Sequence, residues 1–212
     1  IKAIFITHEH IDHIQGAGVL SRRYNIPIYA NSDTWEAMST KIGKIKEENI
    51  KIMDKEISLA DIAILPFDVS HDAAKPVGFN ILWENKKISL LTDTGCVNDT
   101  IKQKIKDSEL VLIETNHDIE LLKVGSYPWP LKRRIMSDYG HLSNETAAYL
   151  LSDILTKGNE IVLLGHLSKE NNFPELAYKT VSNILIEKGF DIIKDLTLEM
   201  TYRDKASKVF KL

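Results

Sequence analysis

The feature that most constrains this chain is a cluster of four metal-capable side chains within six residues, His8-Glu9-His10-Ile11-Asp12-His13. The cluster directly follows the apolar run 1–7, which is typical of a β-strand. Strand geometry continued through the cluster would place His8, His10 and Asp12 in one phase. A catalytic zinc takes three protein ligands, so the motif indicates two metal ions side by side. The alternative is a solvated polar turn, which four ligand-type residues at this spacing disfavour.

Length and composition are those of a globular protein. The chain has 212 residues, of which 43% are hydrophobic and 27% charged, and we expect residues 1–212 to form a single domain. The formal net charge of -3 gives no overall attraction to nucleic acid or to an anionic membrane. A basic groove would therefore have to be local, and Lys132-Arg133-Arg134 is the densest candidate. No apolar segment reaches the length needed to span a bilayer.

Two observations bear on where such a chain works and how it begins. The single cysteine, Cys96, cannot form an internal disulfide, and no secretory signal is present, which favours a cytoplasmic location. The chain starts with Ile1 and enters at once a strand that leads into the metal motif. We therefore expect a fragment or a processed product whose upstream segment is absent.

Strand-like and helical patterns alternate along the chain and predict an α/β fold with helices packed outside the sheets. The expected strands are 2–7, 27–30, 62–69, 77–83, 88–92, 110–113, 160–164 and 196–202. The expected helices are 17–24, one capped by Ser32 or Asp33, 99–106, 130–136, 145–155 capped by Asn144, and 174–188. The strands 77–83 and 88–92 should form a hairpin, and the lysine-rich stretch 41–55 should be solvated.

Three further metal-capable residues each follow an apolar strand: His71, Asp93 and His166. His8 has the same relation to the first strand. A packed core histidine would more often lie inside an apolar run, where one hydrogen bond satisfies it. Several strands that each end in a ligand at one edge of a sheet converge on a single site.

This arrangement resembles the metallo-β-lactamase fold, whose hallmark is His-x-His-x-Asp-His followed by single His, Asp and His ligands on later strands. The resemblance covers nearly the whole chain in the right order and implies an αββα sandwich. The implied ligands are His8, His10 and His71 for a first metal ion, Asp12, His13 and His166 for a second, and Asp93 as the bridge between them. Members of this fold usually carry two or three strands and a helix before the first motif. Those strands are missing here, so we expect one sheet to have an unpaired edge.

Two segments outside the ligand set indicate what the metals act on. Residues 114–118, Glu-Thr-Asn-His-Asp, follow a strand, and residues 138–145 open a helix. Free backbone N–H groups and the dipole at a helix N-terminus favour an anion, and a histidine beside it can contact a phosphate or protonate a leaving oxygen. The candidate phosphate-binding residues are His117, His141, Ser143 and Asn144. A plain helix cap with incidental histidines is the alternative.

The residues of these segments, together with Gly-His-Leu-Ser-Lys-Glu-Asn-Asn at 165–172, are similar to the nucleic-acid-processing branch of the fold, and more similar still to the bacterial YycJ family, also called WalJ. The resemblance implies a two-metal 5′-to-3′ DNA exonuclease associated with mismatch repair, in which a metal-bridging hydroxide attacks the phosphodiester. Asp12 would orient or deprotonate the water, and Glu114 would fix His141. The implied cofactors are two divalent ions (Zn, Mn or Fe), and the implied partner is nucleic acid, DNA or RNA, rather than a membrane.

The sequence leaves three other functions as alternatives to a nuclease. A thioester or lactone hydrolase of the same fold would leave the Gly-His-Leu-Ser segment at 140–143 without an obvious task. A non-catalytic regulatory member would be expected to have lost some ligands, whereas this chain keeps the full set. The redox di-iron branch has Glu in place of the second His of the motif, which here is His10.

Overall fold

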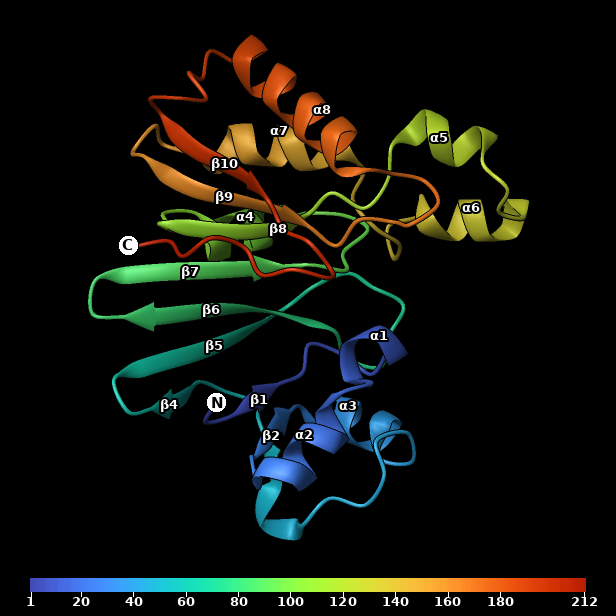
Figure 1. Ribbon diagram of the computed structural model, residues 1–212, viewed down its shortest axis with the longest axis vertical. Coiled ribbons are helices and arrows are strands. Elements are labelled where there is room, and N and C mark those ends of the chain that lie inside the picture. Colours follow the sequence, from blue (N-terminus) through green and yellow to red (C-terminus); the bar gives the residue numbers. More distant parts are fainter.

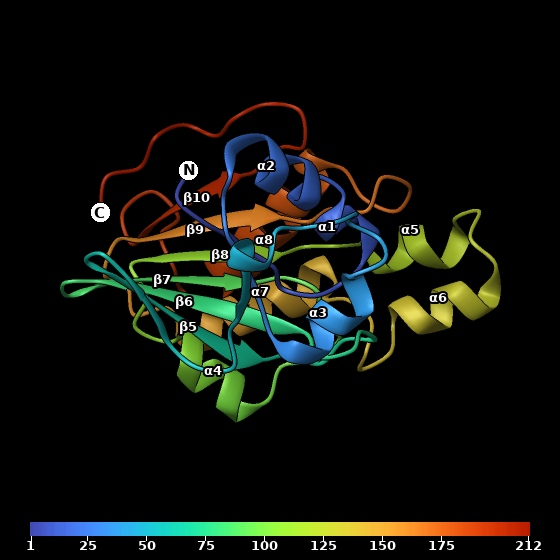
Figure 2. The same cartoon turned by 90° about the horizontal axis from the view of Figure 1, so that it is seen from below.

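The computed structural model describes residues 1–212 and places two β-sheets face to face between two groups of helices (Figures 1 and 2). The strands are β1 (Ile4–Phe5), β2 (Ile28–Ala30), β3 (Ile50–Ile52), β4 (Ile57–Leu59), β5 (Ile62–Asp68), β6 (Val77–Trp83), β7 (Lys86–Leu91), β8 (Leu110–Glu114), β9 (Glu160–Gly165) and β10 (Leu196–Met200). The helices are α1 (Ile11–Ile14), α2 (Ala17–Tyr24), α3 (Ser32–Met38), the 3-10 turn η1 (Glu47–Asn49), α4 (Asp99–Ile105), α5 (Ile119–Val124), α6 (Trp129–Ile135), α7 (Asn144–Ile154) and α8 (Pro174–Glu187). The expected αββα sandwich is confirmed.

The strand order brings several strand ends to one edge of the larger sheet. That sheet has the order β10-β9-β8-β7-β6-β5-β4, and the smaller one has the order β1-β2-β3. Strands β7 to β10 run parallel, while β6 is antiparallel to both β5 and β7. Strands β5, β7, β8 and β9 therefore share one direction, and their carboxyl ends lie at the same edge. The candidate ligands His71, Asp93 and His166 follow three of these ends.

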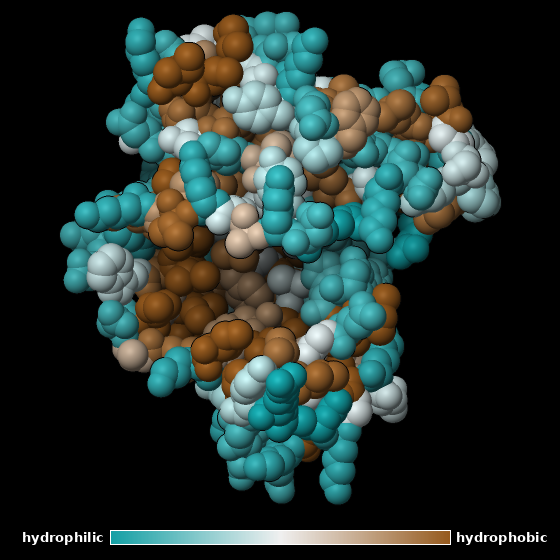
Figure 3. Space-filling model, in the orientation of Figure 1, coloured by the Kyte–Doolittle hydropathy of each residue, from teal (hydrophilic) through white to brown (hydrophobic).

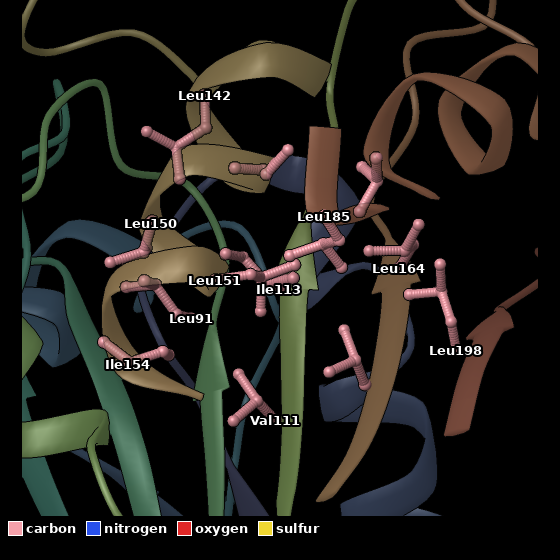
Figure 4. Close-up of a cluster of buried hydrophobic side chains, with 14 of the residues drawn as sticks. Leu91, Val111, Ile113, Leu142, Leu150, Leu151, Ile154, Leu164, Leu185 and Leu198 are labelled. Carbon is pink, nitrogen blue, oxygen red and sulfur yellow. The ribbon is translucent and has the colours of Figure 1, made fainter. Parts of the chain in front are cut away.

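The main core lies between the larger sheet and helices α4, α7 and α8 (Figure 4). It contains 21 buried residues, and they alternate along the strands as expected for a sheet covered on that face. Leu151 of α7 and Ile113 of β8 are both fully buried in it. This core anchors the sheet edge that carries the candidate ligands.

Replacing Leu151 by alanine is expected to lower the free energy of unfolding by about 3 kcal/mol, within the usual range for a large aliphatic side chain deleted from a core. The side chain is fully buried among α7, α8 and the sheet, so the site has little room to collapse. Urea unfolding followed by far-UV circular dichroism measures the change. A loss below 1 kcal/mol would contradict the packing described here, and Leu20→Ala on the exposed side of α2 is the control.

A smaller core joins the two sheets. Met53, Ile64, Val77 and Phe79 are buried there, with Phe5 and Tyr29 stacked beside them at a ring separation of 4.8 Å. The smaller sheet covers only part of the larger one. Figure 3 shows the result, a hollow lined by apolar side chains over β5 to β7. Strand β1 pairs only with β2, so it forms one edge of the smaller sheet, as the resemblance implied.

The structure corrects the expectation for residues 41–55. This stretch is not solvated throughout, because it contains η1 and β3, and Met53 is only 1% exposed. Strand β3 pairs in parallel with β2, and Trp35 donates from its indole Nε1 to the Lys51 carbonyl at 3.0 Å. These contacts come from parts of the chain that a local lysine-rich pattern cannot reveal.

Two helix caps lie one position before the expected residues. Asn31, not Ser32 or Asp33, caps α3, and its Oδ1 accepts a hydrogen bond from the Thr34 N–H at 2.9 Å. Ser143, not Asn144, caps α7 by accepting from the Thr146 N–H at 3.1 Å.

Helix α5 was not expected at all. None of the helices combines the length and apolar character needed to cross a bilayer.

Candidate metal centre

Two of the candidate ligands that follow strands have a left-handed backbone conformation. Asp93 follows β7 and His166 follows β9, and both have φ of 55°. Non-glycine residues rarely adopt this conformation, and it is concentrated at functional sites, where the surrounding fold holds it in place. Here it turns each chain sharply at the sheet edge, so that both side chains face the same point.

The histidine motif reaches that point from the smaller sheet, but not as a continued strand. Strand β1 ends at Phe5, three residues before His8. His10 is the N-cap of the short helix α1, and Asp12 and His13 lie within that helix. The expected alternation of His8, His10 and Asp12 along a strand was therefore wrong. Helix geometry, not strand alternation, therefore sets the directions in which Asp12 and His13 project.

The candidate ligands form two groups of three. Within each group the donor atoms lie within 4.8 Å of one another. The first group is His8, His10 and His71, and the second is Asp12, His13 and His166. His71 Nε2 is 3.3 Å from His10 Nδ1, and His166 Nε2 is 3.8 Å from Asp12 Oδ2. They are two of five overlapping groups close enough to hold a metal ion, so the division into the two sets that the resemblance implied stays a prediction.

Asp93 lies between the two groups. Its Oδ1 is 3.6 Å from His71 Nε2 and 3.5 Å from His166 Nε2, while its Oδ2 is 3.2 Å from His13 Nε2. The carboxylate is almost fully buried. Burial alone would raise the pKa of Asp93, but the hydrogen bond with His13 and the charges of the nearby histidines hold the pKa well below its usual range. An ionised carboxylate in this position suits a ligand shared between two cations.

Thr7 orients two of the rings, a role that the sequence did not reveal. Its Oγ1 is 3.1 Å from the Nδ1 of both His8 and His13. A hydroxyl oxygen has two lone pairs and can accept from both rings. When each ring keeps its proton on Nδ1, its Nε2 is left free toward the centre. The Gly140 carbonyl oxygen lies 3.0 Å from His71 Nδ1 and can orient that ring in the same way, by accepting from its N–H.

Replacing Thr7 by valine is expected to weaken the binding of divalent metal about 10- to 100-fold, the usual effect of removing a group that orients ligands. Valine keeps the shape of threonine but removes the oxygen to which His8 and His13 are directed. Competitive titration with a chromophoric chelator measures the affinity. Thr7→Ser is the matched control and should retain most of it. Equal affinity in the valine and serine variants would contradict the role.

The donor set fits two divalent cations. His8 Nε2 is buried and has no hydrogen-bond partner, a state that costs about 1–3 kcal/mol and that a cation would relieve. Burial lowers the pKa of His8 to about 3, so its ring is neutral at neutral pH, the form that binds metals. Burial would also lower the pKa of His166, but hydrogen bonds with Asp12 and Glu114 raise it to about 10. A positive charge is therefore stabilised at this position.

Glu114 joins the candidate ligands to His141. It is fully buried at the end of β8, where its Oε1 accepts from the backbone N–H groups of Thr94 at 2.8 Å and Leu142 at 3.2 Å. Its Oε2 faces two rings, His141 Nδ1 at 3.1 Å and His166 Nδ1 at 3.3 Å. One buried carboxylate thus fixes both a candidate ligand and the histidine of the 138–145 segment.

The other sequence candidates lie behind the site rather than in it. Ser143 caps α7, and the Asn144 side chain is fully buried and bonded to Asn172. His117 is 2% exposed, and burial lowers its pKa to about 4. None of the three lines the cavity in front of the candidate ligands. The helix N-terminus is closed off because Ser143 occupies it and the segment around Asn172 packs against it.

A cavity of about 390 Å³ opens in front of the donors. His141 and candidate ligands from both groups form its floor. Its walls include Tyr127 just before α6, Arg134 of α6, Lys169 of the loop after β9, and Arg203 of the segment after β10. Arg134 forms an ion pair with Asp72, the residue after His71. The basic run 132–134 had indicated Arg134, but Lys132 is buried and donates to the Lys123 and Gly125 carbonyls. No sequence pattern had indicated Arg203.

Fold and site together define a metal-binding αββα domain of the β-lactamase class, and the comparisons agree. The model of the β-lactamase superfamily domain matches residues 1–167. The crystal structure of the metallo-β-lactamase fold protein YhfI from Bacillus subtilis superposes with a TM-score of 0.66 at 14% identity, over 95% of this chain and 75% of that one. Exodeoxyribonuclease YycJ of Bacillus anthracis is 45% identical over 91% of this chain and 74% of its own length. Exodeoxyribonuclease WalJ of Streptococcus pneumoniae is 43% identical over 100% of this chain and 80% of its own length. The chain belongs to the β-lactamase superfamily and, within it, to the YycJ/WalJ family.

Proposed function

We propose that this chain is a metal-dependent exodeoxyribonuclease that hydrolyses phosphodiester bonds at a DNA end. One observation carries the proposal: a histidine held by a buried carboxylate, His141 with Glu114, lines the same cavity as a complete two-metal donor set. The two relatives named exodeoxyribonucleases support the choice of substrate, because they match nearly the whole chain at 43% identity or more.

The proposed ligands are the two groups of three described above, with Asp93 shared between them. When bound, two divalent cations supply a nucleophilic oxygen at neutral pH and neutralise charge on the phosphate. Five of the seven proposed ligands are imidazoles, a donor set that accepts Zn, Mn or Fe. We further propose that residues 1–212 act as one catalytic domain on DNA in the cytoplasm.

His141 is the proposed contact to the reacting phosphate. Glu114 occupies its Nδ1, so Nε2 is the ring atom left for substrate. Burial would raise the pKa of Glu114, but hydrogen bonds from His141 and His166 outweigh this effect and lower it. An ionised Glu114 accepts from His141 Nδ1 and so holds the ring with Nε2 available to the cavity. That ring can then donate to a phosphate oxygen or give its proton to the leaving oxygen.

The cavity walls offer positive charge for the rest of the DNA backbone. Arg134 approaches from α6, and its ion pair with Asp72 ties that helix to the segment carrying His71. Lys169 and Arg203 stand on the opposite wall and form no salt bridge. Cations in these positions neutralise phosphates on both sides of the bond that is cut, despite the net negative charge of the chain.

Metal-dependent cleavage of DNA tests the proposal. Protein stripped with a chelator should not degrade end-labelled DNA, and adding Mn²⁺ or Zn²⁺ should restore degradation from an end. A thioester and a lactone serve as comparison substrates for the alternative hydrolase chemistry. Metal-dependent thioester or lactone turnover without DNA cleavage would overturn the proposal, as would DNA cleavage that persists in chelator.

A further inference from the structure

A second cavity, of about 810 Å³, lies directly beside the metal centre. It shares Asp12, His166 and the loop segment Leu167–Lys169 with the first cavity, so the two are continuous. Its outer wall consists of the start of α8 and the segment after β10. The proposed reaction uses only Lys169 and Arg203 of this cavity, which leaves the start of α8 and the rest of the segment after β10 without an assigned role.

Two aromatic rings stand at this outer wall without being part of the core. Phe173, just before α8, is 48% exposed, and Tyr202, just after β10, is 44% exposed. Phe173 precedes Pro174 at the helix start and makes no capping hydrogen bond with its side chain. Large apolar rings are usually buried to gain the free energy of removing them from water. Lys205 Nζ lies 3.8 Å from the centroid of the Tyr202 ring and covers one of its faces, so the Phe173 ring and the other face of Tyr202 are the surfaces that a flat ligand could contact.

Two cations complete the wall. Lys169 is exposed, and Arg203 donates to the Leu167 carbonyl, which ties the segment after β10 to the loop that carries Lys169. Neither cation has a carboxylate partner, although Asp204 stands at the rim of the same cavity. Unpaired cations beside exposed aromatic rings suit a ligand that joins a ring system to a phosphate.

We propose that this second cavity binds one unpaired nucleotide next to the phosphodiester that is cut, with its base against Phe173 or Tyr202 and its phosphate against Lys169 and Arg203. The inference rests on the proposed nuclease function. A phosphate at the metal centre requires a nucleotide on each side of it, and the second cavity adjoins the centre through Asp12 and His166. A base inside a duplex has both faces covered by its neighbours, so such a base must leave the stack before it can lie on these rings.

The experiment compares the wild type with the Phe173→Ala/Tyr202→Ala double variant on single-stranded DNA. Three substrates are used: an unmodified strand, one that lacks the base on the terminal nucleotide, and one that lacks the base on the next nucleotide. In the wild type, at least one base-deleted substrate should lose about 5- to 150-fold in kcat/KM, the fold-change that corresponds to the usual worth of stacking one base. In the double variant, the same deletion should cost less than about twofold, because the stacking partner is already gone.

Tyr149→Ala is the matched control, since Tyr149 is 51% exposed on α7 and lines neither cavity. Its response to base deletion should match that of the wild type. Thermal unfolding establishes that the double variant is folded, and Lys169→Ala/Arg203→Ala should reduce the salt dependence of KM. An equal cost of base deletion in the wild type and the double variant overturns the inference while leaving the nuclease intact. A wild type that does not cleave DNA overturns the proposed function itself, and the inference with it.

Discussion

Replacing Asp93 by asparagine is expected to lower the rate of DNA hydrolysis at least about 10³-fold, because the metal centre contributes several kcal/mol to the transition state and each 1.4 kcal/mol is tenfold in rate. The carboxylate lies within 3.2–4.0 Å of four histidines from both groups of candidate ligands. Asparagine keeps the size of the side chain and tolerates the left-handed backbone at this position, so the charge is the main change. Both metals should bind less tightly.

The measurement combines bound metal, from elemental analysis of dialysed protein, with the cleavage rate on end-labelled DNA. Asp107→Asn is the matched control, because Asp107 is exposed, precedes the amino end of β8 whereas the site lies at the carboxyl end, and also has a positive φ, 60°. The control should retain full activity and two metals. If Asp93→Asn keeps both metals and cleaves DNA within tenfold of the wild type, Asp93 is not the shared ligand.

The seven candidate ligands could be predicted from the sequence because each belongs to a pattern visible in the order of the amino acids. Four stand in one motif, and His71, Asp93 and His166 each follow an apolar strand. The strand order then places the last three at one sheet edge. What the sequence could not provide was the path of the chain between them. The motif turns into helix α1 instead of continuing β1, because the pairing of β1 with β2 ends at Phe5.

The residues that sequence analysis missed act through distant contacts. Thr7 stands next to His8 in sequence, yet its importance depends on His13 turning back toward the same oxygen. Arg203 lies on a segment without regular structure and is tied to the loop after His166. Ser143 and Asn144 illustrate the opposite error. Their position at a helix N-terminus suggested an anion site, but packing against the segment around Asn172 closes that end.

Replacing His141 by alanine is expected to lower kcat about 10²- to 10⁴-fold, the usual contribution of a positioned acid or base, while two metals stay bound. His141 lies close enough to His71 and Asp93 to be counted among possible ligands by distance alone. Its Nδ1, however, is directed to Glu114, and the proposed ligand sets already give three donors to each metal ion without it. Elemental analysis with steady-state kinetics separates the two roles. Loss of a metal ion from His141→Ala would make it a ligand instead.

Glu114→Gln distinguishes positioning from direct chemistry. The neutral amide lacks the negative charge that holds the His141 and His166 rings by their Nδ1 atoms, so both kcat and the affinity for the second metal should fall. At saturating metal, the double variant His141→Ala/Glu114→Gln should have the same kcat as His141→Ala alone, since Glu114 acts on the reaction only through that ring. His117→Asn is the control within the same segment and should leave kcat unchanged, because His117 does not line the cavity. Additive losses in the double variant would mean that Glu114 contributes to the reaction by a route other than His141.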